Sequence, residues 1–374
     1  MAHIAVNTRL LLPGRLEGIG RFAYEVLSRM VRQHPDHRYT FFFDRPFDPV
    51  YRFGEQVEAV VVPPPARHPL LWMAWFHAQV PRQLTRRRAD LFFSPEFYLT
   101  NHPRIPQVAV FHDLAYEHAP QDLPPFASWY CRHYSPRYAR RAAHLLTVSA
   151  WVKQDMVARY GLPADKISVA HNGVSRAFVP VLADEQAAVR AQYSQGQPYF
   201  LFVGAVHPRK NLVRLLRAFD QFRSQADAPV KLLLAGRKGW NYREALDTHA
   251  QMQYRDEVLF TGYVSDADLS RLYGAALGLV YVSLLEGFGL PILEAMQAGT
   301  PVITSDCTAM PEVAGDAALL VDPLDEGAIA QAMLRLWREP VLRQRLVAAG
   351  HQQHQRFSWD QTADRVWQVL AQYL

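Results

Sequence analysis

Cysteine is scarce in this chain of 374 residues, because only Cys131 and Cys307 occur and no paired spacing links them. A disulfide framework or a zinc knuckle needs several cysteines at short intervals, so the sequence indicates neither. A reducing compartment fits this usage. Long apolar runs are also missing. The longest, around 70–80 and 275–285, are interrupted or shorter than the ~20 residues that span a bilayer.

The first residues, MAHIAVNTRLLLPG, lack the basic start and long apolar core of a signal peptide. Hydrophobic residues make up 49% of the chain and charged residues only 20%, which favours a globular protein over a disordered one. A chain of this length exceeds one ordinary core, so two domains are expected. We therefore expect a cytoplasmic protein, with peripheral contact at the inner face of the cell membrane left open.

The net charge of +5 is unevenly distributed. Residues 1–180 carry 22 Lys and Arg against 14 Asp and Glu, whereas residues 181–374 carry 18 against 21. A basic first half suits nucleic acid, an anionic membrane or a phosphorylated acceptor. No recognition helix or aromatic RNA-binding motif accompanies it, so we expect no nucleic-acid partner.

A helix interrupted near Pro81 is predicted within residues 70–88. It carries Trp72, Trp75 and Phe76 ahead of a basic cluster that ends at Arg88. An aromatic and basic helix of this kind could lie on a membrane surface. Such aromatics more often belong to the core, with the arginines on a solvated face. Both readings stay open from the sequence.

Residues 286–305, EGFGLPILEAMQAGTPVITS, carry the most informative pattern. An apolar strand at 278–283 leads into a glycine turn, and Pro291 stands where a helix should begin. Glycine lets the backbone approach a ligand closely, and free N–H groups at a helix start favour an anion. Glu286 and Glu294 only accept hydrogen bonds, so they suit sugar and ribose hydroxyls beside a diphosphate. An ordinary turn with two surface glutamates explains the spacing equally well.

This pattern resembles the Glu-x7-Glu signature of retaining glycosyltransferases of the GT-B fold, in the large family numbered four. The resemblance implies that Glu286 lies against the donor sugar and that Glu294 holds the ribose hydroxyls. It also places the backbone of Phe288, Gly289 and Leu290 near the sugar and the diphosphate.

A second motif of this family follows the strand predicted at 199–203. The string GAVHPRKN, which begins at Gly204, resembles the family signature G-x-x-x-P-R-K-N, whose basic pair holds the donor diphosphate. Arg209 and Lys210 would then stabilise the leaving group, Arg through its planar fork and Lys as a point charge. Solvated surface charges without a ligand are the alternative.

Strand and glycine-loop units recur at 230–240, which ends in GRKGW, and at 258–264. Such recurrence is typical of a parallel, doubly wound sheet. In the family the second of these loops, with Tyr263 and Val264, lines the nucleotide base largely through backbone atoms. No GxGxxG is followed by a ribose-binding acid at the expected distance, so an NAD enzyme is the weaker reading.

The first half contains a second glycine pair, Gly18 and Gly20, ahead of a helix predicted over 22–32. A tight turn without a ligand explains the pair by itself. The resemblance implies instead that Gly18 and Gly20 border the donor phosphate and the acceptor cleft, with Arg21 as a further candidate.

His112 and Asp113 follow the strand predicted at 107–111, at the edge where parallel sheets bind ligands. A lone histidine is usually a satisfied or surface residue. The string HDL resembles the family's active-site histidine, which implies that His112 contacts sugar and acceptor while Asp113 orients it. HPDH at 34–37 and HQQH at 351–354 lack a third ligand, so no metal site is predicted.

The resemblance covers essentially the whole chain and implies an α/β protein of the GT-B fold, with two Rossmann-like domains facing across a cleft. The acceptor domain is predicted over 1–175 and the nucleotide-sugar domain over 190–357, with a coil-prone passage at 174–198. Residues 328–355 are predicted to be helical. The last helix, about 358–374, is expected to cross back onto the first domain.

Within the family the chain is most similar to the bacterial mannosyltransferase B type, through GIGRFAYEVL, HPRKN and GRKGW. The likeness implies transfer of a hexosyl unit, commonly mannose from GDP-mannose, to a sugar hydroxyl of a growing glycan or lipid-linked oligosaccharide such as O antigen, with retained configuration. No cofactor or metal is expected, because Arg209, Lys210 and a helix start already supply positive charge.

Retaining hydrolases use a pair of carboxylates. This chain offers Glu286 without an obvious partner, so front-face displacement, with the leaving phosphate taking the acceptor proton, is the favoured hypothesis. The alternatives are a UDP- or dTDP-sugar donor, a GT-B nucleotide-sugar epimerase that needs no acceptor, and a sensor that binds donor without turnover. The sequence indicates neither the linkage nor the oligomeric state.

Overall fold

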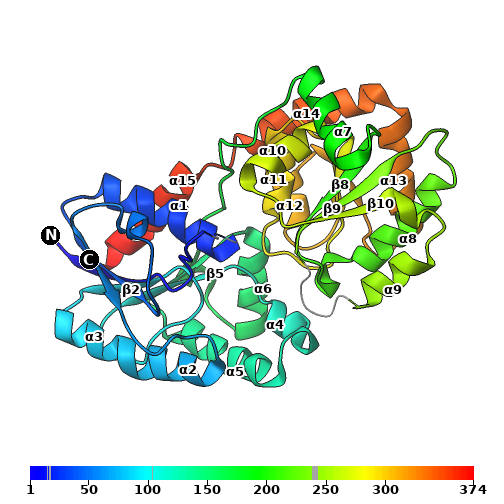
Figure 1. Ribbon diagram of the computed structural model, residues 1–374. Helices are drawn as coiled ribbons and strands as arrows, with labels where there is room; N and C mark the ends of the chain where they lie inside the picture. The colour runs from blue at the N-terminus through cyan, green and yellow to red at the C-terminus, as the bar shows by residue number, and fades with distance from the viewer. Residues whose placement is uncertain (15, 17, 103, 238–242) are drawn as a thin grey trace. The chain divides into compact units, whose positions relative to one another are not determined.

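The computed structural model describes residues 1–14, 16, 18–102, 104–237 and 243–374 (Figure 1). The chain divides into two compact units. The first consists of Met1–Gly173 and Ser358–Leu374, and the second of Val174–Phe357. Each unit contains one parallel sheet covered by helices on both sides (Figure 1).

Seven parallel strands form the sheet of the first unit, in the order β3-β2-β1-β4-β5-β6-β7. The strands are β1 (His3–Asn7), β2 (Arg38–Phe43), β3 (Val57–Val61), β4 (Leu91–Ser94), β5 (Gln107–Phe111), β6 (His144–Thr147) and β7 (Ile167–Val169). The central strands β1, β4 and β5 are buried along their whole length, as expected for a parallel sheet with helices on both faces.

Seven α-helices of the first unit lie in its described residues. They are α1 (Gly18–Gln33), α2 (Pro69–Ala74), α3 (Val80–Arg87), α4 (Ala115–His118), α5 (Pro125–Arg141), α6 (Ala150–Tyr160) and α15 (Trp359–Leu370), with the π-helical turn η2 (Trp75–Gln79) between α2 and α3. Short 3-10 turns are η1 (Pro49–Arg52), η3 (Pro120–Asp122), η4 (Ala164–Lys166) and η7 (Ala371–Tyr373).

The C-terminal helix α15 packs beside α1 in the first unit, although more than 300 residues of sequence separate them (Figure 1). Arg29 of α1 donates to Asp360 at 2.6 Å, and Phe22 meets Trp359 edge-on with ring centroids 6.3 Å apart. Thr362 donates to the carbonyl of His171 at 2.6 Å. The chain therefore returns to the first unit after completing the second.

Two expectations for the first unit need correction. The helix predicted over 22–32 begins at Gly18, so the glycine pair forms its first turn and not a loop ahead of it. The helical segment near Pro81 is continuous but irregular, because the π turn at Trp75–Gln79 directly precedes the proline, which lacks an N–H. Trp75 and Phe76 are fully buried in the core, so neither ring is available to a membrane.

Six parallel strands form the second sheet, in the order β10-β9-β8-β11-β12-β13. They are β8 (Tyr199–Val203), β9 (Lys231–Ala235), β10 (Val258–Gly262), β11 (Gly278–Tyr281), β12 (Val302–Ser305) and β13 (Ala318–Val321). The helices are α7 (Ala183–Ser194), α8 (Leu212–Arg223), α9 (Arg243–Gln251), α10 (Asp266–Ala275), α11 (Leu290–Gln297), α12 (Met310–Ala314), α13 (Glu326–Arg338) and α14 (Pro340–His354), with 3-10 turns η5 (Pro208–Lys210) and η6 (Arg255–Glu257).

Both sheets share one strand order: the first strand of each unit is central, the next two lie on one side and the later ones on the other. The order therefore reverses between β1 and β4 and between β8 and β11. In doubly wound sheets, ligands bind outside the carboxyl ends of the strands at such a reversal. This rule directs attention to the segments that follow β8 and β11.

One expectation for the second unit was wrong. The passage predicted as coil contains the helix α7, held by Gln186 and Arg190 through bonds to the carbonyls of Gly274 and Ala275, and by the buried Val189. The segment predicted as helical over 328–355 is helical and forms two helices, because Pro340 cannot continue a helix from Arg338 and instead begins α14.

Candidate functional site

Three charged residues meet beyond the carboxyl ends of β8 and β11. Lys210 Nζ donates to Glu286 Oε1 at 2.6 Å, and Arg209 Nη1 donates to Glu286 Oε2 at 2.9 Å. The same Lys210 nitrogen lies 2.6 Å from the hydroxyl of Tyr281, and Arg209 also bonds the Leu285 carbonyl at 3.1 Å. The structure thus joins the PRKN motif and the Glu-x7-Glu motif in one cluster.

The carboxylate of Glu286 is ionised in this environment. Burial by itself would raise the pKa of Glu286, whose exposed fraction is only 6%. The positive charges and hydrogen bonds of Arg209 and Lys210 outweigh that effect and lower the pKa to about 2. Burial, with the adjacent Glu286 charge, raises the pKa of Tyr281 well above its usual value, so its hydroxyl stays protonated. One carboxylate between two cations leaves a net charge of +1.

The loop after β8 is shaped locally so that both cations point to one place. His207 caps the short turn η5 by accepting from the Arg209 N–H at 3.3 Å. Asn211 takes a left-handed conformation with φ of 62°, and its buried amide donates to the carbonyls of Val282 and Pro323 at 3.0 and 2.7 Å. Gly204 lies at the end of β8, where a Cβ would sit 3.6 Å from Lys210 Cε. The sequence pattern contained Asn211 without revealing its anchoring role.

The segment after β11 ends in a helix start. Gly289 takes φ of 107°, a conformation open to glycine but strained for other residues, and Pro291 stands in the first turn of α11. Phe288 is buried and packs edge-on against Phe357, while Leu290 is the first residue of the helix. The N-terminus of α11 therefore lies four residues after Glu286, where helix N–H groups favour an anion.

Glu294 lies inside α11 and accepts a hydrogen bond from the hydroxyl of Tyr273 at 2.9 Å. Tyr273 belongs to α10 and is fully buried. Burial first, and the Glu294 charge second, raise the pKa of Tyr273 well above its usual value, so the phenol remains a donor. The sequence did not single out Tyr273 or Tyr281. The available signal was a tyrosine within an apolar segment, whose hydroxyl needs a partner when buried.

Tyr263 and Val264 follow β10, and the side chain of Tyr263 is 65% exposed. Both lie on the same sheet edge as the charged cluster, because β8, β9 and β10 run parallel and adjacent. Of the GRKGW string at 236–240, residues 238–240 lie outside the described part of the chain.

In the first unit, His112 lies directly after β5 and is partly exposed. Its Nε2 bonds the Pro95 carbonyl at 2.8 Å, and its ring meets Phe22 edge-on at 5.0 Å. Burial lowers the pKa of His112, although the Pro95 carbonyl and the charges of Asp113 and Glu96 act in the opposite direction. A neutral ring that donates through Nε2 presents Nδ1 as an acceptor.

The other predicted residues of the first unit have structural partners. Asp113 accepts from the N–H of Ala115 at 3.0 Å, so its side chain holds the turn just before α4. A Cβ on Gly20 would lie 2.6 Å from the Leu10 carbonyl oxygen, so the helix packs there only with glycine. Gly18 begins α1 without such a constraint, and Arg21 lies in the same first turn.

A buried ion pair near His112 went unnoticed in the sequence. Arg9 donates to Glu96 through Nε at 2.5 Å and Nη2 at 2.6 Å, and Asn7 donates to Glu96 at 2.6 Å. The guanidinium of Arg9 also lies 4.8 Å from the ring centroid of Tyr98. Because Glu96 adjoins Pro95, this pair anchors the backbone whose carbonyl accepts from His112.

No group of three or more His, Cys, Asp or Glu side chains is placed to hold a metal ion within the described residues. His34 of the HPDH string stacks on Trp367 with ring centroids 3.7 Å apart, and His351 contacts His354 on α14. Histidines of both strings therefore make ring contacts within the fold.

Two family models match this chain: Glycosyl transferases group 1 over residues 185–353 and Glycosyltransferase Family 4 over residues 16–178. The O-antigen chain mannosyltransferase B of Escherichia coli is 31% identical over 356 residues, which cover 92% of this chain and 93% of that protein. The chain is a family 4 glycosyltransferase. The O-antigen chain mannosyltransferase RfbU of Salmonella typhimurium strain LT2 is 30% identical to this glycosyltransferase over 278 residues, covering 73% and 72% of the two chains.

Solved structures confirm the GT-B fold of this glycosyltransferase. Sucrose-phosphate synthase from Thermosynechococcus elongatus superposes with a TM-score of 0.76 at 19% identity, covering 100% of this chain and 99% of that chain. HepE of Anabaena in complex with UDP-glucose superposes with a TM-score of 0.74 at 16% identity, covering 100% of both chains. Among the described helices of this glycosyltransferase, none has the length and apolar character needed to cross a membrane.

Proposed function

We propose that this glycosyltransferase transfers a mannosyl unit from GDP-mannose to a sugar hydroxyl of a growing glycan or lipid-linked oligosaccharide in surface polysaccharide synthesis, with retained anomeric configuration. The observation that carries the proposal is the cluster in which Arg209 and Lys210 hold Glu286 at 2.9 and 2.6 Å. The choice of mannose is supported by the O-antigen mannosyltransferases that the chain resembles.

The donor diphosphate would lie against Arg209, Lys210 and the N-terminus of α11. These groups offer a guanidinium fork, an ammonium and helix N–H donors, which stabilise the negative charge that develops on the departing diphosphate. Gly204 would let this anion approach the end of β8. The proposal requires no metal ion and no cofactor, because the cations named here supply the positive charge.

The two glutamates would hold hydroxyl groups on either side of the diphosphate. Glu286, ionised and fixed by two cations, would accept hydrogen bonds from hydroxyls of the donor sugar, next to the backbone of residues 288–290. Glu294, oriented by Tyr273, would accept from the ribose, and the backbone of Tyr263 and Val264 would lie along the base. His112 would contact sugar and acceptor, with Gly18 and Gly20 near the phosphate and the acceptor.

Front-face displacement accounts for retention in this proposal. The acceptor hydroxyl attacks the anomeric carbon on the side that the diphosphate leaves, and the leaving phosphate oxygen takes the acceptor proton. Glu286 already receives two charge-assisted hydrogen bonds and its pKa of about 2 makes it a weak base. This supports a holding role for the carboxylate over a role as general base.

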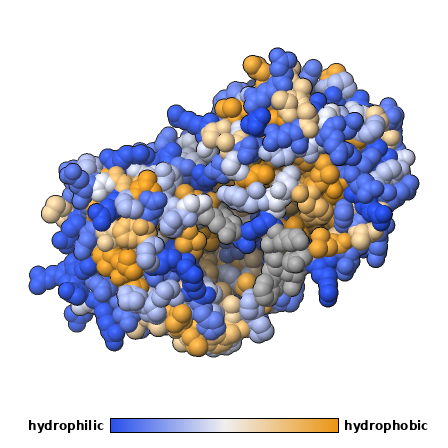
Figure 2. Space-filling view, viewed as in Figure 1, coloured by the Kyte–Doolittle hydropathy of each residue, from blue (hydrophilic) through white to orange (hydrophobic). Residues whose placement is uncertain are grey.

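The acceptor unit carries an exposed aromatic edge that we propose as a peripheral membrane contact. Phe126 and Trp129 of α5 are 39% and 47% exposed and stack with ring centroids 5.4 Å apart, and Leu70 of α2 is 58% exposed. Figure 2 shows hydrophobic residues on the surface where α2 and α5 lie. The exposed Arg132 and Arg137 on α5 suit anionic headgroups.

A panel of nucleotide sugars tests the donor. GDP-mannose should raise the melting temperature of the purified chain, and UDP-glucose, dTDP-rhamnose and UDP-galactose should not. Incubation with GDP-mannose alone should leave the sugar unchanged, because an epimerase would isomerise it without an acceptor. With a mannose-terminated oligosaccharide acceptor, proton NMR should show an α-linked product. Stabilisation by a UDP-sugar alone would overturn the donor assignment.

A further inference from the structure

A cavity of about 620 Å³ opens at the amino ends of the strands of the second sheet, on the side opposite the charged cluster. Its lining includes Pro198, Leu277 and Pro301, which immediately precede β8, β11 and β12. The strands are parallel, so these residues lie at the amino ends, whereas Arg209, Lys210 and Glu286 lie beyond the carboxyl ends. The cavity is therefore separate from the proposed donor site.

The cavity has the size and lining of a small-molecule site. Its volume falls in the ~300–1,000 Å³ range of ligand pockets. Apolar groups dominate the lining, and Val347 and Ala348 of α14 form part of one wall. Trp337 lines another part, and its indole N–H is held by Asp227 at 2.7 Å. A fixed aromatic ring beside aliphatic groups suits the flat or apolar body of a ligand.

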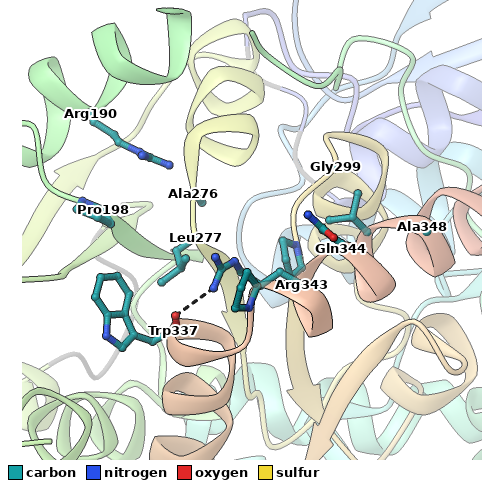
Figure 3. Close-up of a pocket in the computed structure, with 12 residues that line it drawn as sticks. Arg190, Pro198, Ala276, Leu277, Gly299, Trp337, Arg343, Gln344 and Ala348 are labelled. Atoms are coloured by element: carbon teal, nitrogen blue, oxygen red, sulfur yellow. Dashed lines mark hydrogen bonds between the residues drawn. The ribbon is translucent and has the colours of Figure 1, made fainter. Parts of the chain in front are cut away.

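Two arginines supply the positive charge of this cavity, Arg190 from α7 and Arg343 from α14 (Figure 3). Each is anchored by a carbonyl at the end of a helix. Arg190 Nε donates to the Ala275 carbonyl at 3.2 Å, and Arg343 Nη1 donates to the Leu336 and Trp337 carbonyls at 2.5 and 3.0 Å. Figure 3 shows both guanidinium groups drawn toward the segment that contains Ala276 and Leu277.

The anchoring bonds leave a complete fork on each guanidinium. Arg190 keeps both terminal nitrogens, and Arg343 keeps Nε and Nη2. Among the described residues no carboxylate pairs with either arginine, whereas Arg209, Arg217, Arg223, Arg271 and Arg335 of the same unit each pair with a glutamate. A fork with two parallel N–H donors matches the oxygens of a phosphate or carboxylate.

We propose that this cavity binds a small organic phosphate, with the phosphate between Arg190 and Arg343 and an apolar body against Leu277 and Trp337. Two guanidinium charges balance the two negative charges of a phosphate monoester. The cavity also touches α7, α13 and α14 and the amino ends of three strands, so an occupied site would tie these elements together. Binding here does not depend on the identity of the sugar donor.

Calorimetric titration of the full chain with phenyl phosphate tests the proposal. Phenyl phosphate should bind, inorganic phosphate should bind more weakly for want of the apolar body, and benzyl alcohol should show no heat. Arg190→Gln and Arg343→Gln should each weaken phenyl phosphate binding by about tenfold or more, since a charge-assisted fork is lost. Arg335→Gln, a control at an exposed position of α13, should leave binding within about twofold.

Two further variants separate this site from folding defects and from the donor cluster. Ala348→Trp keeps both arginines but fills the cavity, so it should also weaken phenyl phosphate binding by about tenfold or more. Lys210→Ala should leave phenyl phosphate binding unchanged, because Lys210 lies beyond the carboxyl ends of the strands and the cavity lies at their amino ends. Equal affinity in the parent, Arg343→Gln and Ala348→Trp proteins would overturn the proposal, as would loss of binding in Lys210→Ala alone.

Discussion

The ammonium of Lys210 lies 2.6 Å from the carboxylate of Glu286, although 76 residues of sequence separate them. The first residue belongs to the motif assigned to the diphosphate and the second to the motif assigned to the sugar. Because Arg209 completes the pair, the three side chains act as one charged unit. Substitutions within the unit are therefore expected to be non-additive.

Lys210→Ala should weaken nucleotide-sugar binding by at least about tenfold and lower kcat further, because a hydrogen bond to a charged group is worth ~1.5–3 kcal/mol. Titration calorimetry and initial rates measure the two effects. Lys231→Ala, at the other end of the sheet on β9, is the matched control and should bind donor normally. The combination with Glu286→Gln should cost less than the two single changes together, and strict additivity would contradict a shared unit.

Glu286 should contribute acid-sensitive stability. Its pKa in the folded chain, about 2, is below the ordinary 4.5, so the folded state binds fewer protons than the unfolded state between these values. The contribution, ~3 kcal/mol at most, is complete above about pH 4.5 and is lost as the pH falls toward 2.

The melting temperature of Glu286→Gln should therefore lie below that of the parent at pH 7, with the gap closing as the pH falls below 4.5. Circular dichroism across this range measures the gap. Glu326→Gln removes an exposed ion pair with Arg217 and should have little effect at any pH. A gap that stays constant down to pH 2.5 would rule out this role of the carboxylate.

Tyr273→Phe removes only the hydroxyl that donates to Glu294 at 2.9 Å. Loss of this bond, worth ~1 kcal/mol, should raise KM for the donor about fivefold while kcat changes little, because Tyr273 orients the ribose-holding group and not the reacting atoms. Tyr199→Phe is a close control, since its buried hydroxyl donates to the Leu272 carbonyl in the same unit. An unchanged KM in Tyr273→Phe would show that the orientation of Glu294 does not matter.

Arg9→Met should destabilise the first unit by ~3–5 kcal/mol, because Glu96 would remain buried and unpaired. The double change Arg9→Met with Glu96→Leu should cost less than Arg9→Met alone. Thermal unfolding measures both effects. As a control, Arg335→Met removes an exposed ion pair with Glu339 and should shift the melting temperature only slightly. If the double change were the more damaging one, an unpaired charge would not be the cause.

Vesicles that contain anionic lipid should retain the chain on sedimentation, and Trp129→Ser should reduce the bound fraction about fivefold or more. Raised salt should weaken binding too, since Arg132 and Arg137 contribute through charge. Phe260→Ser changes an aromatic residue of the second unit that is exposed to a similar extent, 41%, and should have no effect. Equal retention of the two variants would show that α5 does not make the membrane contact.

Local signals in the sequence predicted most elements around the site. Pro291 and the glycine turn before it located the start of α11, and the apolar segment at 199–203 matched β8 residue for residue. The errors fell where tertiary contacts decide. Helix α7 has a weak pattern and forms because Arg190 and Gln186 bond the end of α10. By contrast, the core position that the sequence favoured for Trp75 and Phe76 is confirmed.

The sequence by itself determined that the chain contains two glycine-and-helix motifs suited to a diphosphate flanked by hydroxyls, because such motifs depend on short-range backbone geometry. Only the tertiary structure decided which side chains meet. Burial of Glu286 between Arg209 and Lys210, and of Glu294 against Tyr273, depends on the parallel packing of β8 and β11 and on α10 lying beside α11. Contacts between residues 21 to 77 positions apart follow from strand order, which no local pattern contains.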